Sequence, residues 1–343
     1  MGRYEQGRFL GEDDADRNGL AGRTVAVLGY GHLGRSMALN LRDAGVEVGV
    51  GNIADDYRTL ANEDGFQVLG LAEATAGAEL VYLLLPDEVI PDLFTECVEP
   101  NLTSGSALCL ASGYVLAFGL VRPSKEIDVL LLAPRMLGAE VRRTVVEAQG
   151  FLSYLNVEQD ASGHAWSRLL ALAHAAGSLR RGAMVLSAAQ EATLDLFIEQ
   201  SVGPYLGMAV QMAFAVGSEA GIPSEALVLE MYMSGEMSRT IQGFAEEGFY
   251  QAVRGHGLAA TYGGFLGTLS LDGEAMRRQF IQVLQRIRSG EFARRLQQER
   301  AEGYPTCAAI DKITAGDDAL TEAERRVRAG QNGSAGRADQ RRP

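Results

Sequence analysis

The chain has 343 residues, of which 47% are hydrophobic and 22% charged, and its net charge is −13. This length predicts two domains, and the negative charge argues against nucleic acid and anionic membrane surfaces as partners. No run of about 18 apolar residues appears, so we expect no membrane span. The N-terminus is polar and acidic, unlike a secretory signal. The three cysteines form no CxxC pair, which is typical of reduced thiols in a cytoplasmic protein.

The first half of the chain alternates strand-like and helix-like segments. This alternation predicts an α/β domain with a doubly wound parallel sheet over about residues 20–155. The strand signal ends near residue 160, and the sequence is then helical to about residue 300, so we expect an all-α domain to follow. The strand-like apolar runs are residues 24–29, 46–51, 78–86, 106–112 and 127–134.

A GxGxxG motif lies between the first strand and the helix that follows it. In this context Gly29 permits a tight turn, Gly31 allows the backbone to approach a pyrophosphate, and Gly34 lets the helix pack close to the strand. The helix N-terminus offers free amides to the phosphates. The motif therefore predicts a Rossmann domain that binds a dinucleotide through Gly29, Tyr30, Gly31, His32, Leu33 and Gly34.

The loop after the second strand, "GNIADDYRT", bears on the choice of dinucleotide. Acidic side chains there hydrogen-bond the ribose hydroxyls and repel a 2′-phosphate. Asn52, Asp55 and Asp56 are therefore cofactor-binding candidates, and NAD(H) is favoured over NADP(H). The alternative is that the two acids cap a helix that starts near Tyr57.

Three carboxylates, Glu191, Asp195 and Glu199, follow one another at intervals of four in a stretch that otherwise reads as a buried helix. They share one helical face, where like charges repel. The line has three interpretations: a solvated helix edge, a balance for arginines such as Arg180 and Arg181, or oxygen ligands for Mg²⁺.

A second acidic pair, Glu230 and Glu236, comes later in "SEALVLEMYMSGEMSRTI". The two residues are six apart, so one straight helix would point them to different sides. This spacing weakens a metal site argued from the pattern alone.

Several motifs together resemble one known family. They are, in order, "VAVLGYGHLGRSMALNLRDAGVEVGVG", "LLLPDEVIPDLF", "PNLTSG", "DVLLLAP", "VEQDASGHA", "LDLFIEQ", "AEEGFYQAV" and "ATYGG". On these residues the chain resembles the ketol-acid reductoisomerase family in its short, class I-like form, over about residues 20–300. The motif after the third strand adds Leu85 and Pro86 to the cofactor-binding candidates.

The resemblance implies a Rossmann domain followed by a knotted helical domain that forms a homodimer with shared active sites. It implies that Mg²⁺ promotes an alkyl shift in a 2-hydroxy-2-acyl acid and that the nicotinamide reduces the resulting ketone. Two family metal ligands match Asp195 and Glu199, with Glu191 as a neighbour. We place an N-terminal extension at 1–20, the NAD(P)-binding domain at 21–185, the helical domain at 186–325 and a disordered tail, poor in apolar residues, at 326–343.

The chain departs from the family at chemically important positions. Ser112 stands where the family has a histidine, Arg135 where it has a lysine, and Gly257 where it has a substrate-binding serine. Arginine keeps the positive charge but does not donate a proton at neutral pH. Arg135 has two interpretations, a substrate-carboxylate ligand or a structural ion pair.

The second metal-ligand pair is also disturbed. Aligned from the left, Glu230 matches a ligand and Ser234 replaces the other; aligned from the right, Tyr232 replaces one and Glu236 matches. His256 is new beside this pocket, either as an acid–base group or as a packed helix residue. Candidate metal ligands are therefore Asp195, Glu199, Glu230 and Glu236, and candidate catalytic residues are Asp195, Glu199, Arg135, Ser112 and His256.

These replacements favour an NAD(P)H-dependent, Mg²⁺-assisted oxidoreductase that acts on an altered keto or imino acid in a specialised biosynthetic pathway. One alternative is a genuine ketol-acid reductoisomerase of branched-chain amino acid biosynthesis. Two others are an isomerase or lyase that uses bound NAD, and a non-catalytic homologue. The intact glycine and carboxylate motifs speak against the last.

Overall fold

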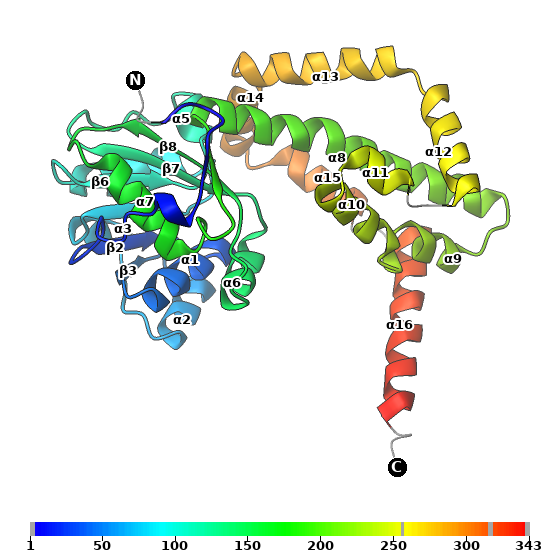
Figure 1. The fold of residues 1–343 in the computed structure, drawn as a ribbon, viewed down its shortest axis with the longest axis horizontal. Coiled ribbons are helices and arrows are strands. Elements are labelled where there is room, and N and C mark those ends of the chain that lie inside the picture. Colours follow the sequence, from blue (N-terminus) through cyan, green and yellow to red (C-terminus); the bar gives the residue numbers. More distant parts are fainter. Residues whose placement is uncertain (1–3, 255–256, 315–317, 340–343) are drawn as a thin grey trace. The chain divides into compact units, whose positions relative to one another are not determined.

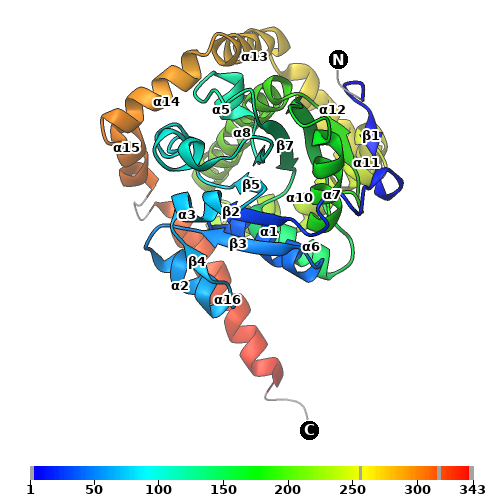
Figure 2. The same cartoon turned by 90° about the vertical axis from the view of Figure 1, so that its left-hand side faces the viewer.

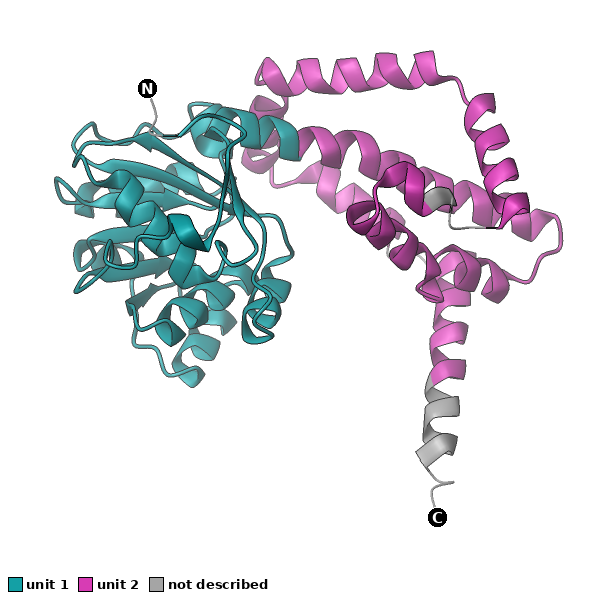
Figure 3. Cartoon of the chain, in the orientation of Figure 1, with its two compact units in different colours: residues 1–195 teal, residues 196–343 magenta. Residues whose placement is uncertain are grey.

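The computed structural model describes residues 4–254, 257–314 and 318–339. The chain divides into two compact units, residues 1–195 and residues 196–343 (Figure 3). The division falls inside helix α8 (Ala188–Glu219), which starts in the first unit and continues into the second. Within the described ranges no helix combines the length and apolarity that a membrane crossing would need.

The strands of the first unit form one sheet (Figure 1). It has nine strands in the order β1-β9-β8-β7-β6-β5-β2-β3-β4. Strands β4, β3, β2, β5, β6 and β7 are parallel neighbours, which confirms the predicted doubly wound sheet. The strands are β1 (Phe9–Leu10), β2 (Thr24–Leu28), β3 (Glu47–Gly51), β4 (Val68–Leu69), β5 (Leu80–Leu83), β6 (Ala107–Leu110), β7 (Asp128–Pro134), β8 (Ser153–Gln159) and β9 (Ala183–Val185).

The sheet extends further than the sequence indicates. Strand β8 runs antiparallel to β7, β9 pairs parallel with β8, and β1 closes that edge antiparallel to β9. The expectation that strands end near residue 160 is therefore wrong, because β9 comes later. Strands of two or three residues, such as β1 and β9, are too short to show a period-two pattern.

Helices cover both faces of the sheet. Helix α1 packs against α6 and α7 on one face, beside each other in Figure 2, and α3 packs against η2 and η3 on the other. The helical segments of this unit are η1 (Glu12–Asp14), α1 (His32–Asp43), α2 (Asp56–Glu63), α3 (Leu71–Ala76), α4 (Ile90–Leu93), η2 (Phe94–Val98), η3 (Glu99–Asn101), α5 (Tyr114–Ala117), α6 (Gly138–Val146) and α7 (Ala165–Ala176).

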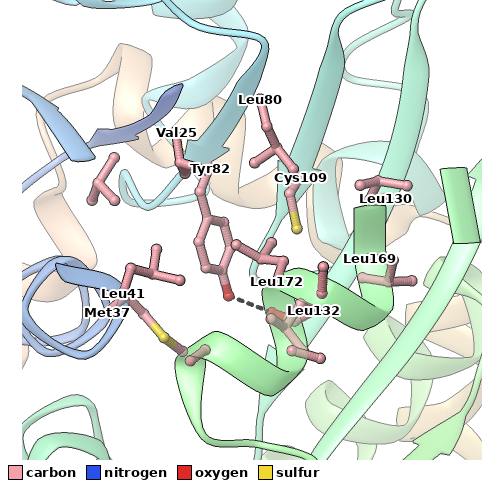
Figure 4. Packing of buried hydrophobic residues seen from close by; sticks show 14 of the residues in the cluster. Val25, Met37, Leu41, Leu80, Tyr82, Cys109, Leu130, Leu132, Leu169 and Leu172 are labelled. Atoms are coloured by element: carbon pink, nitrogen blue, oxygen red, sulfur yellow. Dashed lines mark hydrogen bonds between the residues drawn. The ribbon is translucent and has the colours of Figure 1, made fainter. Parts of the chain in front are cut away.

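The core of the first unit lies between the central strands and α1 and α7. Tyr82, from β5, is fully buried among leucine, valine and methionine side chains (Figure 4). Its hydroxyl donates a hydrogen bond of 2.7 Å to the carbonyl oxygen of Leu132 on β7, so the polar atom is satisfied inside the apolar layer.

The second unit is helical throughout its described residues, as expected. Helix α16 packs against α9, where Phe214, Val228, Ala323 and Val327 form a small core. Its helices after α8 are α9 (Ser224–Val228), η4 (Leu229–Met233), α10 (Glu236–Glu246), α11 (Phe249–Arg254), α12 (Leu258–Ser270), α13 (Gly273–Arg288), α14 (Glu291–Ala301), α15 (Pro305–Thr314) and α16 (Ala319–Asp339).

Helix α16 runs to Asp339 and so includes part of the segment 326–343 that the sequence analysis places in a disordered tail. Alanine, glutamate and arginine are strong helix formers, and ion pairs support its first turns. Arg326 pairs with Glu225 of α9, and Arg328 Nη2 lies 2.7 Å from Glu324 Oε2. The low hydrophobicity of this segment gave no indication of these ion pairs.

Candidate active site

The glycine turn connects β2 to α1 and has the shape that a pyrophosphate needs. Gly29 has a φ of +94°, and an added Cβ would lie 2.6 Å from the carbonyl oxygen of Leu84. A Cβ on Gly34 would lie 1.9 Å from the Gly29 carbonyl oxygen, whereas one on Gly31 would meet no atom within 4 Å. Gly29 and Gly34 are thus required by packing, and Gly31 leaves open space above an uncapped helix N-terminus.

Asn52 at the end of β3 holds this turn in place. Its side-chain oxygen accepts a 2.9 Å hydrogen bond from the backbone N–H of Tyr30, and its Nδ2 donates to Asp55 Oδ1 at 2.7 Å. The Tyr30 side chain itself is buried, and its hydroxyl donates to Asp64 Oδ2 at 2.9 Å. The Tyr30 side chain therefore packs in the core under the turn, and its ring is not accessible to a ligand.

Asp55 has the capping role that the sequence left open. It is the N-cap of α2 and accepts from the Arg58 backbone N–H at 3.0 Å. The Arg58 guanidinium donates to the carbonyl oxygens of Asn52 and Val68, at 3.1 and 2.9 Å. Asp55 and Asp56 are both exposed at the end of β3, so capping leaves their negative charges beside the cofactor turn.

The remaining cofactor candidates surround the same turn. Leu85 packs on it, because a Cβ on Gly29 would lie 3.0 Å from Leu85 Cδ2, and Pro86 follows in an exposed position. The His32 ring lies 6.2 Å from that of Tyr57, edge to face. Gly138, which the sequence reasoning missed, brings the start of α6 to the backbone of His32 and Leu33, since its Cβ would lie 2.7 Å from Leu33 N.

Arg135, at the end of β7, binds two members of the carboxylate line. Its Nη2 donates to Glu191 Oε1 at 2.9 Å and its Nη1 to Asp195 Oδ1 at 2.6 Å. Its Nε donates to the Pro134 carbonyl oxygen at 3.0 Å, and the guanidinium lies 5.1 Å from the centre of the Tyr154 ring. The arginine that balances these two carboxylates is thus Arg135, not Arg180 or Arg181.

Glu191 is fully buried and uses both of its oxygens. Besides the bond from Arg135, its Oε2 accepts a 2.7 Å hydrogen bond from the backbone N–H of Gly113. Burial raises the pKa of Glu191 to about 7, although Arg135 and the Gly113 N–H act in the opposite direction. With both oxygens engaged in protein, Glu191 anchors the start of α8 to the loops after β6 and β7.

Gly113 is a site residue that the sequence reasoning did not single out. An added Cβ would lie 2.1 Å from the carbonyl oxygen of Ala188, so only glycine allows the loop after β6 to pack on α8. The adjacent Ser112 is half-buried, and its Oγ accepts from the backbone N–H of Tyr114 at 3.2 Å. The glycine in "ASGY", between a strand and a helix, was the available signal.

The expected metal ligands are carboxylates of the kind that Mg²⁺ prefers. The Asp195 side chain is 41% exposed and is held by Arg135 through one oxygen, while Glu199 lies exposed one turn further along α8. Among the residues that the structure describes, no three histidine, cysteine, aspartate or glutamate side chains gather in a metal-binding group.

Glu230 and Glu236 share one cavity despite their spacing of six. The chain makes a wide turn at η4, breaks at Gly235 with a φ of +83°, and starts α10 at Glu236. Both carboxylates line a cavity of about 430 Å³ together with Met231 and Thr261. The segment is therefore not one straight helix, so the spacing of six does not place Glu230 and Glu236 on different sides.

Two further candidates lie near α12. His256 falls outside the described residues, so neither of its two interpretations is tested. Gly257 is the N-cap of α12 and contributes no side-chain hydrogen bond, in keeping with the loss of a serine hydroxyl at this position.

Comparisons with known proteins cover both units. Residues 19–182 match the family model of the acetohydroxy acid isomeroreductase NADPH-binding domain, and residues 189–332 match that of the ketol-acid reductoisomerase C-terminal domain. The chain is 36% identical over 297 residues to the ketol-acid reductoisomerase (NADP(+)) of Kineococcus radiotolerans, covering 86% of each chain. It is 37% identical over 286 residues to that of Caldivirga maquilingensis, covering 82% of this chain and 86% of the relative.

A solved structure agrees with these matches. The NADH-preferring ketol-acid reductoisomerase from an uncultured archean has a TM-score of 0.89 and 29% sequence identity, with 94% of this chain and 98% of the other covered. A Rossmann-type nucleotide-binding unit, an all-helical second unit and sequence matches along both together lead to one conclusion: this chain belongs to the ketol-acid reductoisomerase family of NAD(P)H-dependent oxidoreductases.

Proposed function

We propose that the chain is an NADH-dependent, Mg²⁺-assisted reductase of a keto or imino acid other than the usual acetohydroxy acids. The observation that carries this proposal is the binding of Glu191 and Asp195 by Arg135. A guanidinium retains its proton at neutral pH, so it cannot exchange one with a substrate hydroxyl. Ser112, where the resemblance implies a histidine, leaves the site with one fewer proton-transfer group.

Exposed acids beside the glycine turn support the preference for NADH. Asp55 and Asp56 lie at the end of β3, where an acidic residue accepts hydrogen bonds from ribose hydroxyls and repels a 2′-phosphate. The Arg58 guanidinium donates hydrogen bonds to two backbone carbonyl oxygens, so these donors are not available to a 2′-phosphate.

Two copies of the chain would complete the active site. Apolar side chains remain exposed along α8 and α12, and surfaces of this kind mark interaction sites. No three potential ligands meet within the described part of one chain, so we assign Asp195 and Glu199 of one copy and Glu230 and Glu236 of another to Mg²⁺. The exposed side chains include Val202 (50%), Leu206 (53%), Met212 (51%), Val216 (64%), Leu258 (85%), Tyr262 (66%) and Leu269 (81%).

The chain's own residues would divide the work as follows. The glycine turn holds the pyrophosphate of the nicotinamide cofactor, which supplies a hydride when bound. Mg²⁺, when bound, polarises a substrate oxygen. Arg135 fixes Asp195 in position through the Nη1–Oδ1 bond and retains its proton at neutral pH.

A genuine ketol-acid reductoisomerase is the second candidate, and a specific observation favours it. The two relatives that carry this name are 36% and 37% identical to the chain over most of its length. An isomerase or lyase with bound NAD differs from both candidates by consuming no NADH. A non-catalytic homologue would differ by the absence of a melting-temperature shift with cofactor and metal.

The deciding experiment measures NADH and NADPH oxidation with 2-acetolactate and with 3-hydroxypyruvate, each with and without Mg²⁺. The first substrate requires the alkyl shift and the reduction, whereas the second reports reduction alone. We expect NADH-dependent turnover of 3-hydroxypyruvate and none of 2-acetolactate, with Arg135→Lys gaining activity on 2-acetolactate. Exposed Arg122 supplies the matched control, Arg122→Lys. Turnover of 2-acetolactate by the unaltered enzyme, at a rate similar to that of 3-hydroxypyruvate, would establish the second candidate.

A further inference from the structure

One cavity of the first unit lies away from the glycine turn. It has a volume of about 700 Å³ and opens beside the residues that precede β2 and β3 and beside the carboxyl end of α1. The glycine turn is at the opposite edge of the sheet, at the amino end of α1. Since α1 has 12 residues, about 18 Å of helix separates the two places.

Positive charge dominates the lining of this cavity, which we call the arginine cavity. Four guanidinium groups face two carboxylates, in a protein whose overall charge is −13. Apolar side chains, among them Leu20, Val46 and Val145, complete the wall. The charged residues of the lining are Arg17, Arg23, Arg142, Arg180, Asp43 and Glu47, together with His174.

One arginine is fixed in place by the surrounding protein. Arg142 Nη1 donates to Asn40 Oδ1 at 2.8 Å and its Nη2 to Asp43 Oδ2 at 2.5 Å. Asn40 is itself buried and donates through Nδ2 to the carbonyl oxygen of Ala176 at 3.1 Å. This chain of bonds ties α1, α6 and α7 together at the cavity and makes its floor rigid.

Two other arginines are left without a counter-charge. Arg23 and Arg180 have no acidic partner among the residues that the structure describes. Arg17 is weakly paired, with its Nη2 3.9 Å from Glu12 Oε2, and is 72% exposed. The Nδ1 atom of His174 is buried, lies 3.4 Å from the same carboxylate oxygen, and makes no hydrogen bond. Several donors at one cavity therefore remain available to an anion.

We infer that the arginine cavity binds a small anion that carries a phosphate group. The planar guanidinium offers paired donors that match phosphate oxygens, and Arg23 and Arg180 supply uncompensated charge. A volume of about 700 Å³ is in the range of small-molecule sites, so it holds a phosphate together with an organic body against the apolar wall. This site is separate from the dinucleotide turn and does not depend on the substrate of the enzyme.

The test measures pyrophosphate binding by calorimetry, with NADH in excess so that the glycine turn is occupied. The double variant Arg23→Gln/Arg180→Gln removes the uncompensated charges. The control Arg122→Gln/Arg181→Gln removes two exposed arginines outside the cavity lining and changes the net charge equally. We expect saturable binding whose Kd rises at least tenfold in the cavity variant and less than twofold in the control.

Hydrogen exchange on the unaltered protein locates the site independently of any variant. Pyrophosphate is expected to slow exchange in segments 17–23 and 171–180, and the same experiment with a phosphate monoester shows whether the organic body adds affinity. Absence of saturable binding, an equal loss in both double variants, or protection confined to the glycine turn would each overturn the inference.

Discussion

The pH dependence of stability tests whether burial or the ion pair with Arg135 determines the pKa of Glu191, at the start of α8. The side chain is fully buried, and its pKa is raised from 4.5 to about 7 although it contacts Arg135. A carboxyl whose pKa is higher in the folded state binds its proton more tightly there. Its contribution to stability is therefore present at low pH and is lost as the pH rises from about 4.5 through about 7.

The magnitude follows from these two pKa values. Between pH 5 and pH 8 the folded state loses about 2.5 kcal/mol relative to a protein without this titrating group. The variant Glu191→Gln keeps the size of the side chain and removes the titration. Between pH 5 and pH 8, we expect the free energy of unfolding of the unaltered protein to fall by about 2.5 kcal/mol relative to that of the variant.

The assay is urea unfolding of both proteins at pH 5, 6, 7 and 8, in the presence of EDTA so that bound metal does not contribute. Glu126→Gln, at an exposed position before β7, is the control and should show no pH-dependent difference. If the ion pair with Arg135 outweighed burial, the pKa of Glu191 would lie below 4.5. The stability difference would then be constant from pH 5 upward, and that result would refute the reasoning.

Three further substitutions test the fold and the cofactor turn. Gly34→Ala places a Cβ 1.9 Å from the Gly29 carbonyl oxygen, so we expect loss of NADH binding, measured by fluorescence titration. Tyr82→Phe removes a buried hydrogen bond to a carbonyl on β7 and should cost about 1 kcal/mol in urea unfolding. Arg168→Met leaves the fully buried Asp128 without its 2.8 Å ion-pair partner, and a loss of about 3–5 kcal/mol is expected.

The parallel part of the sheet could be predicted because its strands are apolar and separated by helices. β2, β3, β5, β6 and β7 all occur where continuous apolar runs indicate buried strands. The edge at β8, β9 and β1 was largely missed, since its pairing joins segments far apart in the chain, and short strands carry little local signal.

The candidate site was predictable in its residue types but not in its contacts. The glycine motif identified the turn because each of its glycines is needed for a local steric reason, and these reasons recur at a fixed spacing in the sequence. The partner of Glu191 could not be found this way, since Arg135 is 56 residues away and meets it only through the fold. The shared cavity of Glu230 and Glu236 was hidden for another reason, because a helix break at Gly235 changes the geometry that spacing implies.

The line of carboxylates on α8 is thus not a row of equal charges. Glu191, with a pKa of about 7, carries a partial charge near neutral pH, and Arg135 lies between it and Asp195 with a bond to each. The repulsion expected at a spacing of four is therefore largely compensated at the buried end of the line. The line is therefore divided between a buried end at Glu191, which Arg135 binds, and an exposed end at Glu199.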